Sequence, residues 1–366
     1  MDLGQRVDAV VDAALGSRIV GCVVLVHDKG QRVYARAAGF ADREAGVPVQ
    51  EDTIFRLASV TKPIVAAAAL KMIDLGLLSL DDPVTKYLPF FTPRAPDGTT
   101  PVITVRHLLT HTSGIAYSKI PDDVSRGSDP FPLFPLEENL RRLARGELAF
   151  PPGEGWAYGM SIDVLGGVIG AINGDISDVE AAARRHVLDP LGMVDTRFTV
   201  TDRARLAVPY GDGDPEPFRM AEPQFIHNAI GGPHTMSPVR IFQKEAAQSS
   251  GSGMAGTAGD FMKLLDAIVV GDFLKPETRD AALSNQVGSF LTGRRGGEQF
   301  GYLGAVITDA GAAGWPREGL IRWGGIWGNN WALDPKTRTI AVAFTNTMYE
   351  GSDGRFRDEL RDAVFG

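Results

Sequence analysis

The chain has 366 residues, of which 44% are hydrophobic and 22% charged, a normal globular mix that suffices for one large or two ordinary domains. Its net charge of −8 and pI near 5.3 argue against a nucleic-acid or anionic-membrane surface, because both need clustered Lys and Arg. The single cysteine, Cys22, excludes an internal disulfide framework.

The first residues carry no signal-peptide pattern, and no apolar run reaches the roughly 18 to 20 residues of a membrane span. We therefore expect a soluble, cytoplasmic protein. Apolar residues at helical spacing predict an amphipathic helix from Leu3 to about Gly16. Strand-like runs follow at 19–27 and 32–38, separated by Asp28-Lys29-Gly30, which indicates a hairpin.

The middle of the chain reads as helix and loop. A helix is expected at 59–75 and a short one at 104–109, capped by Thr104. Four prolines exclude a long helix from 115–136. Further helical patterns cover 137–145, 161–172 and 179–187, whereas 196–250 is rich in Pro and Gly and receives no assignment.

Towards the C-terminus a helix is predicted at 257–269. Strands are predicted at 300–308, 319–323, 330–333 and 339–346, and an amphipathic helix at 353–365. Strands at both ends of the chain with helices between them predict a discontinuous α/β domain, residues 1–85 and 196–366, interrupted by a helical domain at 86–195.

Ser59 and Lys62 stand three residues apart at the start of the helix expected at 59–75. Residues i and i+3 share a helix face, so the hydroxyl and the amine can meet there. Pro63 fits only in a first helical turn, which places the helix start close to Ser59. A serine nucleophile with a lysine base needs this arrangement, although an N-cap serine and a surface lysine produce the same four-residue pattern.

Two later segments also bear on chemistry. Tyr158 is a candidate second base, since a neighbouring ammonium makes a phenol easier to ionise, although a tyrosine taken alone at a helix start is more often an aromatic anchor. Trp323-Gly324-Gly325-Ile326-Trp327 lies in a predicted strand. Glycine in a strand marks either close approach of a ligand or backbone, or a bulge.

Other sites find less support. His107 and His111 are four residues apart, but no glutamate stands between them as in H-E-x-x-H and no third ligand is evident, so we expect no metal. These histidines are expected to shape a loop beside the cleft. The absence of a G-x-S-x-G sequence disfavours an α/β-hydrolase.

Three segments in this order, Ser59-Val60-Thr61-Lys62, Tyr158-Gly159-Met160 and Trp323-Gly324-Gly325, resemble the motifs of the serine β-lactamase and penicillin-binding-protein superfamily. Residues 108–114 and 252–257 also resemble its signatures, and within it the chain is most similar to the family VIII carboxylesterases. The resemblance implies a class C β-lactamase-like fold, an antiparallel sheet flanked by helices with an inserted helical domain.

For the site, the resemblance implies Ser59 as nucleophile, Lys62 and Tyr158 as general base and proton shuttle, and the N–H groups of Ser59 and Ile326 as oxyanion hole. No cofactor is implied. We expect Lys62 to be neutral, with its pKa lowered by burial. Which of Lys62 and Tyr158 is the resting base stays open.

Met160 stands where penicillin-recognising members carry Asn, and Trp323 where they carry Lys or His. Apolar groups at these places favour neutral acyl esters over anionic β-lactams. Trp323, Gly324, Gly325, Met160, Tyr117 and Trp327 are the expected substrate-binding residues.

The predicted function is therefore a serine carboxylesterase for small-molecule, short-chain acyl esters. Alternatives on the same site are an amidase or D-stereospecific peptidase, an acyltransferase and a weak β-lactamase. A catalytically silent binding domain is the alternative from another class. The sequence leaves the oligomeric state open.

Overall fold

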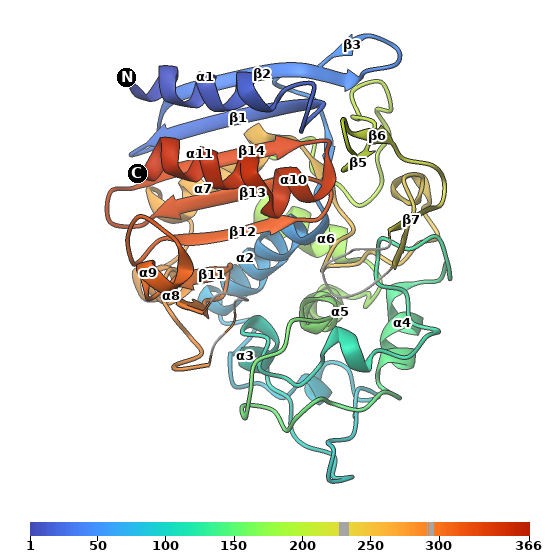
Figure 1. The fold of residues 1–366 in the computed structure, drawn as a ribbon. Coiled ribbons are helices and arrows are strands. Elements are labelled where there is room, and N and C mark those ends of the chain that lie inside the picture. Colours follow the sequence, from blue (N-terminus) through green and yellow to red (C-terminus); the bar gives the residue numbers. More distant parts are fainter. Residues whose placement is uncertain (227–233, 291, 293–295) are drawn as a thin grey trace.

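A computed structural model describes residues 1–226, 234–290, 292 and 296–366 of the chain. At its centre lies an eight-stranded sheet with the order β10-β11-β12-β13-β14-β1-β2-β3 (Figure 1). Every pairing in this sheet is antiparallel. β1 (Gly21–Asp28) pairs with β14 (Thr339–Thr345), so the two ends of the chain build one sheet, as predicted.

The predicted first hairpin is confirmed. β1 and β2 (Gln31–Asp42) are joined at Lys29 and Gly30, which have φ of 51° and 77°. Positive φ at both central residues defines the type I′ turn, whose twist matches that of the strands it joins.

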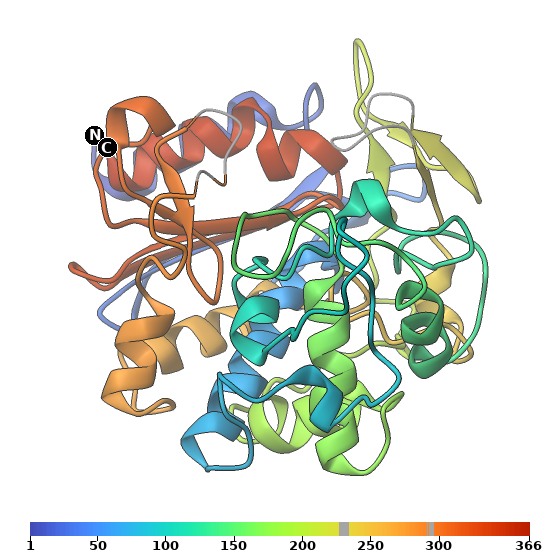
Figure 2. The ribbon, with the colours of Figure 1, turned by 90° about the horizontal axis from the view of Figure 1, so that it is seen from below.

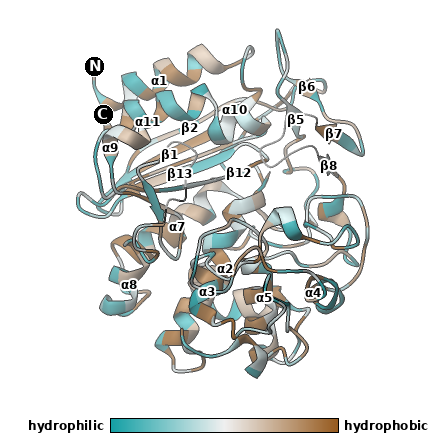
Figure 3. Cartoon of the chain, turned by 60° about the horizontal axis from the view of Figure 1, so that its bottom comes forward, coloured by the Kyte–Doolittle hydropathy of each residue, from teal (hydrophilic) through white to brown (hydrophobic). Residues whose placement is uncertain are grey.

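Helices cover both faces of the sheet (Figures 1 and 2). α1 (Leu3–Ala14), α10 (Met348–Asp353) and α11 (Arg355–Phe365) lie on one face, and α2 (Thr61–Asp74) and α7 (Ala258–Val269) on the other. The alternation along β1 explains the layers, because Cys22 and Val24 pack with α1 and α11 while Val23 and Leu25 face the larger core. Hydrophilic and hydrophobic segments alternate along α1 and α11 (Figure 3), as expected for helices with one solvated face.

The helical part follows α2 and consists of α3 (Val105–Leu109), α4 (Leu136–Leu143), α5 (Ser161–Asn173) and α6 (Val179–Ala183), the last continued by a π-helical turn at Arg184–Leu188. The predicted helices of this region are thus present. One hydrophobic core runs from the sheet through α2 into α3 and α5. The division at residues 85/86 and 195/196 stays a prediction.

One expectation near the C-terminus was wrong. The strand expected at 300–308 is a hairpin of β10 (Glu298–Phe300) and β11 (Ala305–Ile307), because the chain reverses between Gly301 and Gly304, where Gly301 N donates to the Gly304 carbonyl at 2.8 Å. The predicted closing helix is present, but it begins at Arg355, since Gly354 separates it from α10.

Several short elements lacked a sequence signal. β12 (Ile321–Gly325) and β13 (Asn329–Asp334) match the predicted strands, but the following were not expected: β3 (Val47–Pro48), β4 (Phe55–Arg56), β5 (Tyr210–Gly211), β6 (Phe218–Arg219), β7 (Gln224–Ile226), β8 (His234–Met236), β9 (Ala255–Gly256), α8 (Pro276–Ala282) and α9 (Ala310–Ala313). Four of these strands fall in the unassigned stretch 196–250, of which residues 227–233 lie outside the described residues. Within the described part of the chain, the helices are too short or too polar to cross a bilayer, and the cytoplasmic location stays a prediction.

Candidate active site

Ser59 lies in a 3₁₀ turn, Ala58–Val60, that leads directly into α2. Ala58 has φ of 44°, a left-handed conformation that costs a non-glycine residue about 1 to 3 kcal/mol and persists only where packing enforces it. Ala58 and Val60 are buried, whereas Ser59 between them is partly exposed. The strained turn therefore presents one hydroxyl at the surface of an otherwise buried segment.

Lys62 reaches Ser59 from the first turn of α2. Its Nζ donates to Ser59 Oγ at 3.2 Å and to the Gly251 carbonyl at 2.7 Å. α2 is buried almost all round, and Lys62 is only 4% exposed. The predicted i, i+3 contact is thus present, and the lysine ammonium is fixed by two acceptors.

Tyr158 approaches the same oxygen from the loop before α5. Its hydroxyl donates to Ser59 Oγ at 2.8 Å, and Lys62 Nζ lies 4.6 Å from the centre of its ring. The backbone holds the tyrosine in place, since Tyr117 N donates to the Tyr158 carbonyl at 3.3 Å and Ala157 N to that of His111 at 3.0 Å. The side chains of Ser59, Lys62 and Tyr158 therefore meet at one atom, Ser59 Oγ.

The charge on Lys62 differs from expectation. Burial alone lowers the pKa of its ammonium group, but the neighbouring Tyr117, Tyr158 and Asp163 outweigh burial and raise that pKa above its ordinary value. The expectation of a lowered pKa was therefore wrong, because the sequence did not place Tyr117 and Asp163 beside this amine.

The end of β12 packs against the backbone of the serine turn. A methyl group on Gly325 would lie 2.1 Å from the Leu57 carbonyl oxygen and 3.3 Å from Ser59 N. β12 and β13 stay in continuous register here, so the glycine marks close approach of two backbone segments and not a bulge. Asn329 secures this contact from β13, where its Nδ2 donates to the Arg56 carbonyl at 2.7 Å. Ile326 follows Gly325 in the sequence and so stands one residue beyond this contact.

Aromatic rings surround Tyr158. Trp323 and Tyr117, both expected at the substrate, lie edge-on to it with ring centres 5.2 Å and 5.6 Å away. His111 lies 4.9 Å away and is completely buried, and neither of its ring nitrogens has a hydrogen-bond partner. Burial and the nearby Lys62 hold the pKa of His111 well below its usual value, so this ring is neutral.

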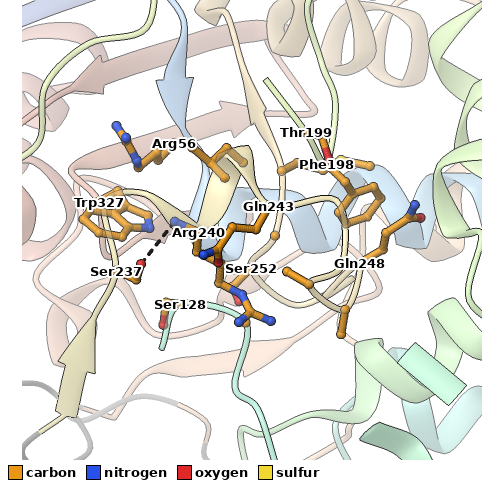
Figure 4. Close-up of a pocket in the computed structure, with 16 residues that line it drawn as sticks. Arg56, Ser128, Phe198, Thr199, Ser237, Arg240, Gln243, Gln248, Ser252 and Trp327 are labelled. Atoms are coloured by element: carbon orange, nitrogen blue, oxygen red, sulfur yellow. Dashed lines mark hydrogen bonds between the residues drawn. The ribbon is translucent and has the colours of Figure 1, made fainter. Parts of the chain in front are cut away.

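The other two expected substrate-binding side chains lie elsewhere. Met160 is 0% exposed and belongs to the main hydrophobic core, so it offers no surface to a substrate. Trp327 packs on Ala58 and lines a cavity of about 30 Å³ together with Arg56, Ser237, Arg240 and Ser252 (Figure 4). Such a cavity holds two or three water molecules, since each needs about 10 to 15 Å³. Neither Ser59, Lys62 nor Tyr158 lines it.

Two residues at the site escaped the sequence reasoning. Asp163 is 1% exposed in the first turn of α5, and its Oδ1 accepts a hydrogen bond from Ser249 Oγ at 2.6 Å. Gly251 supplies the carbonyl that binds Lys62. One signal was available for Asp163, because an acidic residue in a helix as apolar as α5 is uncommon unless it has a partner.

The described residues contain no group of three or more His, Cys, Asp or Glu side chains arranged to hold a metal ion. His107, which with His111 was the candidate metal-binding pair, accepts a hydrogen bond at Nδ1 from Thr104 N (3.2 Å) and so takes part in the capping box of α3. His111 contributes to the wall of aromatic rings instead.

The fold and the contacts of Lys62 and Tyr158 with Ser59 Oγ define a serine hydrolase with a β-lactamase-like fold. Comparison with known families agrees. The model of the family described as "Beta-lactamase" matches residues 7–364, and the chain belongs to this family. Among characterised proteins it is similar to Esterase EstB of Burkholderia gladioli, with 45% identity over 99% of this chain and 95% of that protein.

Solved structures agree with this placement. The chain resembles "EstCE1, a hydrolase with promiscuous acyltransferase activity", with a TM-score of 0.95, 38% identity and coverage of 100% of this chain and 98% of that one. It shares its fold with the simvastatin synthase LovD from Aspergillus terreus (unliganded selenomethionyl form), with a TM-score of 0.73, 23% identity and coverage of 100% and 98%.

Proposed function

We propose that this protein is a serine carboxylesterase of the family VIII type, which hydrolyses small, neutral, short-chain acyl esters through an acyl-enzyme on Ser59. The observation that carries the proposal is that Tyr158 and Lys62 both lie within hydrogen-bond distance of Ser59 Oγ, at 2.8 Å and 3.2 Å. A nucleophile with an adjacent base is the requirement for acyl transfer through serine. The similarity to Esterase EstB supports the ester as substrate.

In the first half of the reaction, the Tyr158–Lys62 pair has already released one proton to water, and the proton of Ser59 passes to this pair while Oγ attacks the ester carbonyl. The N–H groups of Ser59 and Ile326 are the proposed donors to the negative charge that develops on the carbonyl oxygen, and the close approach of Gly325 to Leu57 and to Ser59 N supports this assignment. The carbon–oxygen ester bond then breaks, and the alcohol leaves with the proton returned by Tyr158. In the second half, water attacks the acyl carbonyl and gives a proton to the same pair. The bond between the acyl carbon and Ser59 Oγ then breaks, Oγ takes this proton from the pair, and the acid leaves.

The walls of the site favour neutral substrates. Trp323 and Tyr117 present aromatic surface beside Tyr158, and Trp323 stands where a cation would bind an anionic β-lactam. We therefore expect weak or absent opening of β-lactam rings. Efficient turnover of a chromogenic cephalosporin at its lactam ring would contradict this specificity.

Acyl transfer to an alcohol is a second candidate activity. The related EstCE1 is described as a hydrolase with promiscuous acyltransferase activity, and an acyl-enzyme on Ser59 accepts either water or an alcohol as nucleophile. p-Nitrophenyl butyrate with and without an added alcohol, followed by analysis of the products, separates the two. A matching amide substrate tests the amidase alternative in the same experiment.

Replacement of Ser59 by alanine tests the proposal. The variant is expected to lose ester hydrolysis and labelling by a fluorophosphonate, with unchanged thermal unfolding, because a partly exposed hydroxyl is removed and no core packing. Ser118→Ala is the matched control, since Ser118 is exposed in a 3₁₀ turn, and it should retain both activities. Activity near wild type in Ser59→Ala, or no labelling of the wild type, would refute the proposal.

A further inference from the structure

Asp163 is a buried carboxylate that the proposed reaction does not use. It lies at the start of α5, five residues after Tyr158, and is 1% exposed. A carboxyl group removed from water is normally neutralised or paired. The described contacts of Asp163 include no direct ion pair, so its retention in the core calls for another partner.

The groups that touch Asp163 are hydrogen-bond donors. Ser249 Oγ donates to Oδ1 at 2.6 Å, and the backbone N–H groups of Gly251 and of Asp163 itself also stabilise its charged form. The first turn of a helix adds the positive end of the macrodipole. An ionised carboxylate accepts from every side whereas a protonated one must also donate, so this environment suits the carboxylate.

Asp163 and Lys62 face each other across Gly251. A methyl group built on Gly251 would lie 2.4 Å from Asp163 Oδ2 and 3.2 Å from Lys62 Nζ, so these two atoms are under about 6 Å apart. The Gly251 carbonyl accepts from Lys62 while its N–H interacts with Asp163. Glycine at this position leaves the space between the two charges free of any side chain.

We propose that Asp163 is a positioning residue that holds Lys62 as an ammonium ion, and that it thereby sets the pH range in which Ser59 is activated as a nucleophile. The inference rests on the proposed function. With the ammonium proton retained on Nζ and the Tyr158 hydroxyl proton first released to water, the proton of Ser59 Oγ passes to the Tyr158 oxygen as the new carbon–oxygen bond forms. The same proton then passes from Tyr158 to the oxygen of the departing alcohol, so Lys62 acts as a fixed charge throughout.

The raised pKa of Lys62 agrees with this assignment, because Asp163 is among the groups that raise it. Burial raises the pKa of Asp163 above its ordinary value, and Lys62, Ser249 and Gly251 offset that effect only in part. Other titratable and charged groups surround Asp163 and Lys62, namely Tyr117, Tyr158, His111 and Arg240. Arg126 acts on Tyr117.

The pH profile of Asp163→Asn tests the proposal. Two unit charges about 5 Å apart at an effective dielectric constant near 20 shift a pKa by roughly 2 units. Loss of the negative charge makes the Tyr158–Lys62 pair release its protons more readily, so both limbs of the kcat/KM profile should move to lower pH by at least about one unit. The rate of fluorophosphonate labelling of Ser59 should move in the same way.

Asp260→Asn is the matched control, because Asp260 is also buried (2% exposed) but binds Thr196 and Lys263. It should leave the profile in place even if it lowers stability. A shift of under one unit in folded Asp163→Asn would overturn the inference. If Asp163→Asn does not fold, Ser249→Ala withdraws one donor from the carboxylate and should give a smaller shift in the same direction, and an unchanged profile would count against the inference.

Failure of the inference differs from failure of the proposed function. An unshifted profile of Asp163→Asn together with an inactive Ser59→Ala rejects the role of Asp163 alone. An active Ser59→Ala rejects the serine mechanism itself.

Discussion

Replacement of Gly325 by alanine tests how the sheet and the serine turn fit together. The added methyl group would lie 2.1 Å from the Leu57 carbonyl oxygen, and an ordinary contact needs at least 3.4 Å. Both partners are backbone, so no side chain can rotate away. The end of β12 and the turn must therefore separate by more than 1 Å.

This separation falls at the proposed oxyanion hole, whose two N–H groups belong to Ser59 and Ile326. Misplacement by about 1 Å costs about 10²-fold in rate, and loss of one oxyanion donor costs about 10² to 10³ in kcat. We expect kcat of Gly325→Ala on p-nitrophenyl butyrate to fall by about 10² or more, with KM changed much less. The sheet should stay folded, because only the last residue of β12 is displaced.

The matched control is Gly259→Ala in the first turn of α7. A methyl group there would find no atom nearer than 3.9 Å, and alanine favours a helix over glycine by up to about 1 kcal/mol. This variant should keep wild-type kcat and unfold at the same or a slightly higher temperature. A folded Gly325→Ala enzyme with kcat within twofold of wild type would refute the reasoning from backbone contact.

Three further predictions concern stability. His111 is buried and neutral, with its pKa lowered, so between about pH 6.5 and 5 only the unfolded chain takes up its proton. The free energy of unfolding should therefore fall by up to about 1.4 kcal/mol per pH unit on acidification. In denaturant titrations, His111→Asn should show a weaker dependence of this free energy on pH. Thr257 Oγ1 caps α7 by accepting a hydrogen bond from Asp260 N at 3.1 Å. Thr257→Ala should therefore lower the free energy of unfolding, measured with heat or urea, by about 1 kcal/mol. An equal loss in Thr257→Ser, which keeps a hydroxyl, would contradict the role of the cap. Trp331 is 1% exposed with its ring centre 5.8 Å from that of Phe261, so Trp331→Ala should lose about 3 to 5 kcal/mol, and a loss under about 1 kcal/mol would contradict its place in the core.

The long elements were predictable because each has a regular pattern. The hairpin at Lys29 and Gly30 and the helix beginning near Ser59 depend on neighbours in the sequence, and both were located to within a few residues. The hairpin hidden in 300–308 was missed because the apolar run reads through Gly301 and Gly304, and only tertiary pairing shows the reversal. The two-residue strands exist through distant partners, as in the pairing of β4 with β9, and so leave no local periodicity.

At the site, residue identity was more predictable than environment. The sequence reasoning named the three side chains that meet at Ser59 Oγ, since each stands in a motif. It could not anticipate the electrostatic surroundings of Lys62, because Asp163 and Gly251 come to it from α5 and from a loop nearly 190 residues away. Met160 was assigned to the pocket from its position in a motif, but motif position does not determine which way a side chain points.

The pairing of β1 with β14 also governs how this protein can fold. More than 300 residues separate the two strands, so the loop-closure entropy of joining them must be overcome before the centre of the sheet exists. During synthesis, the apolar edge Val23-Val24-Leu25-Val26 emerges from the ribosome long before its partner and stays unprotected in the meantime. We therefore expect slow maturation and a strong dependence of recombinant yield on growth temperature and chaperone supply.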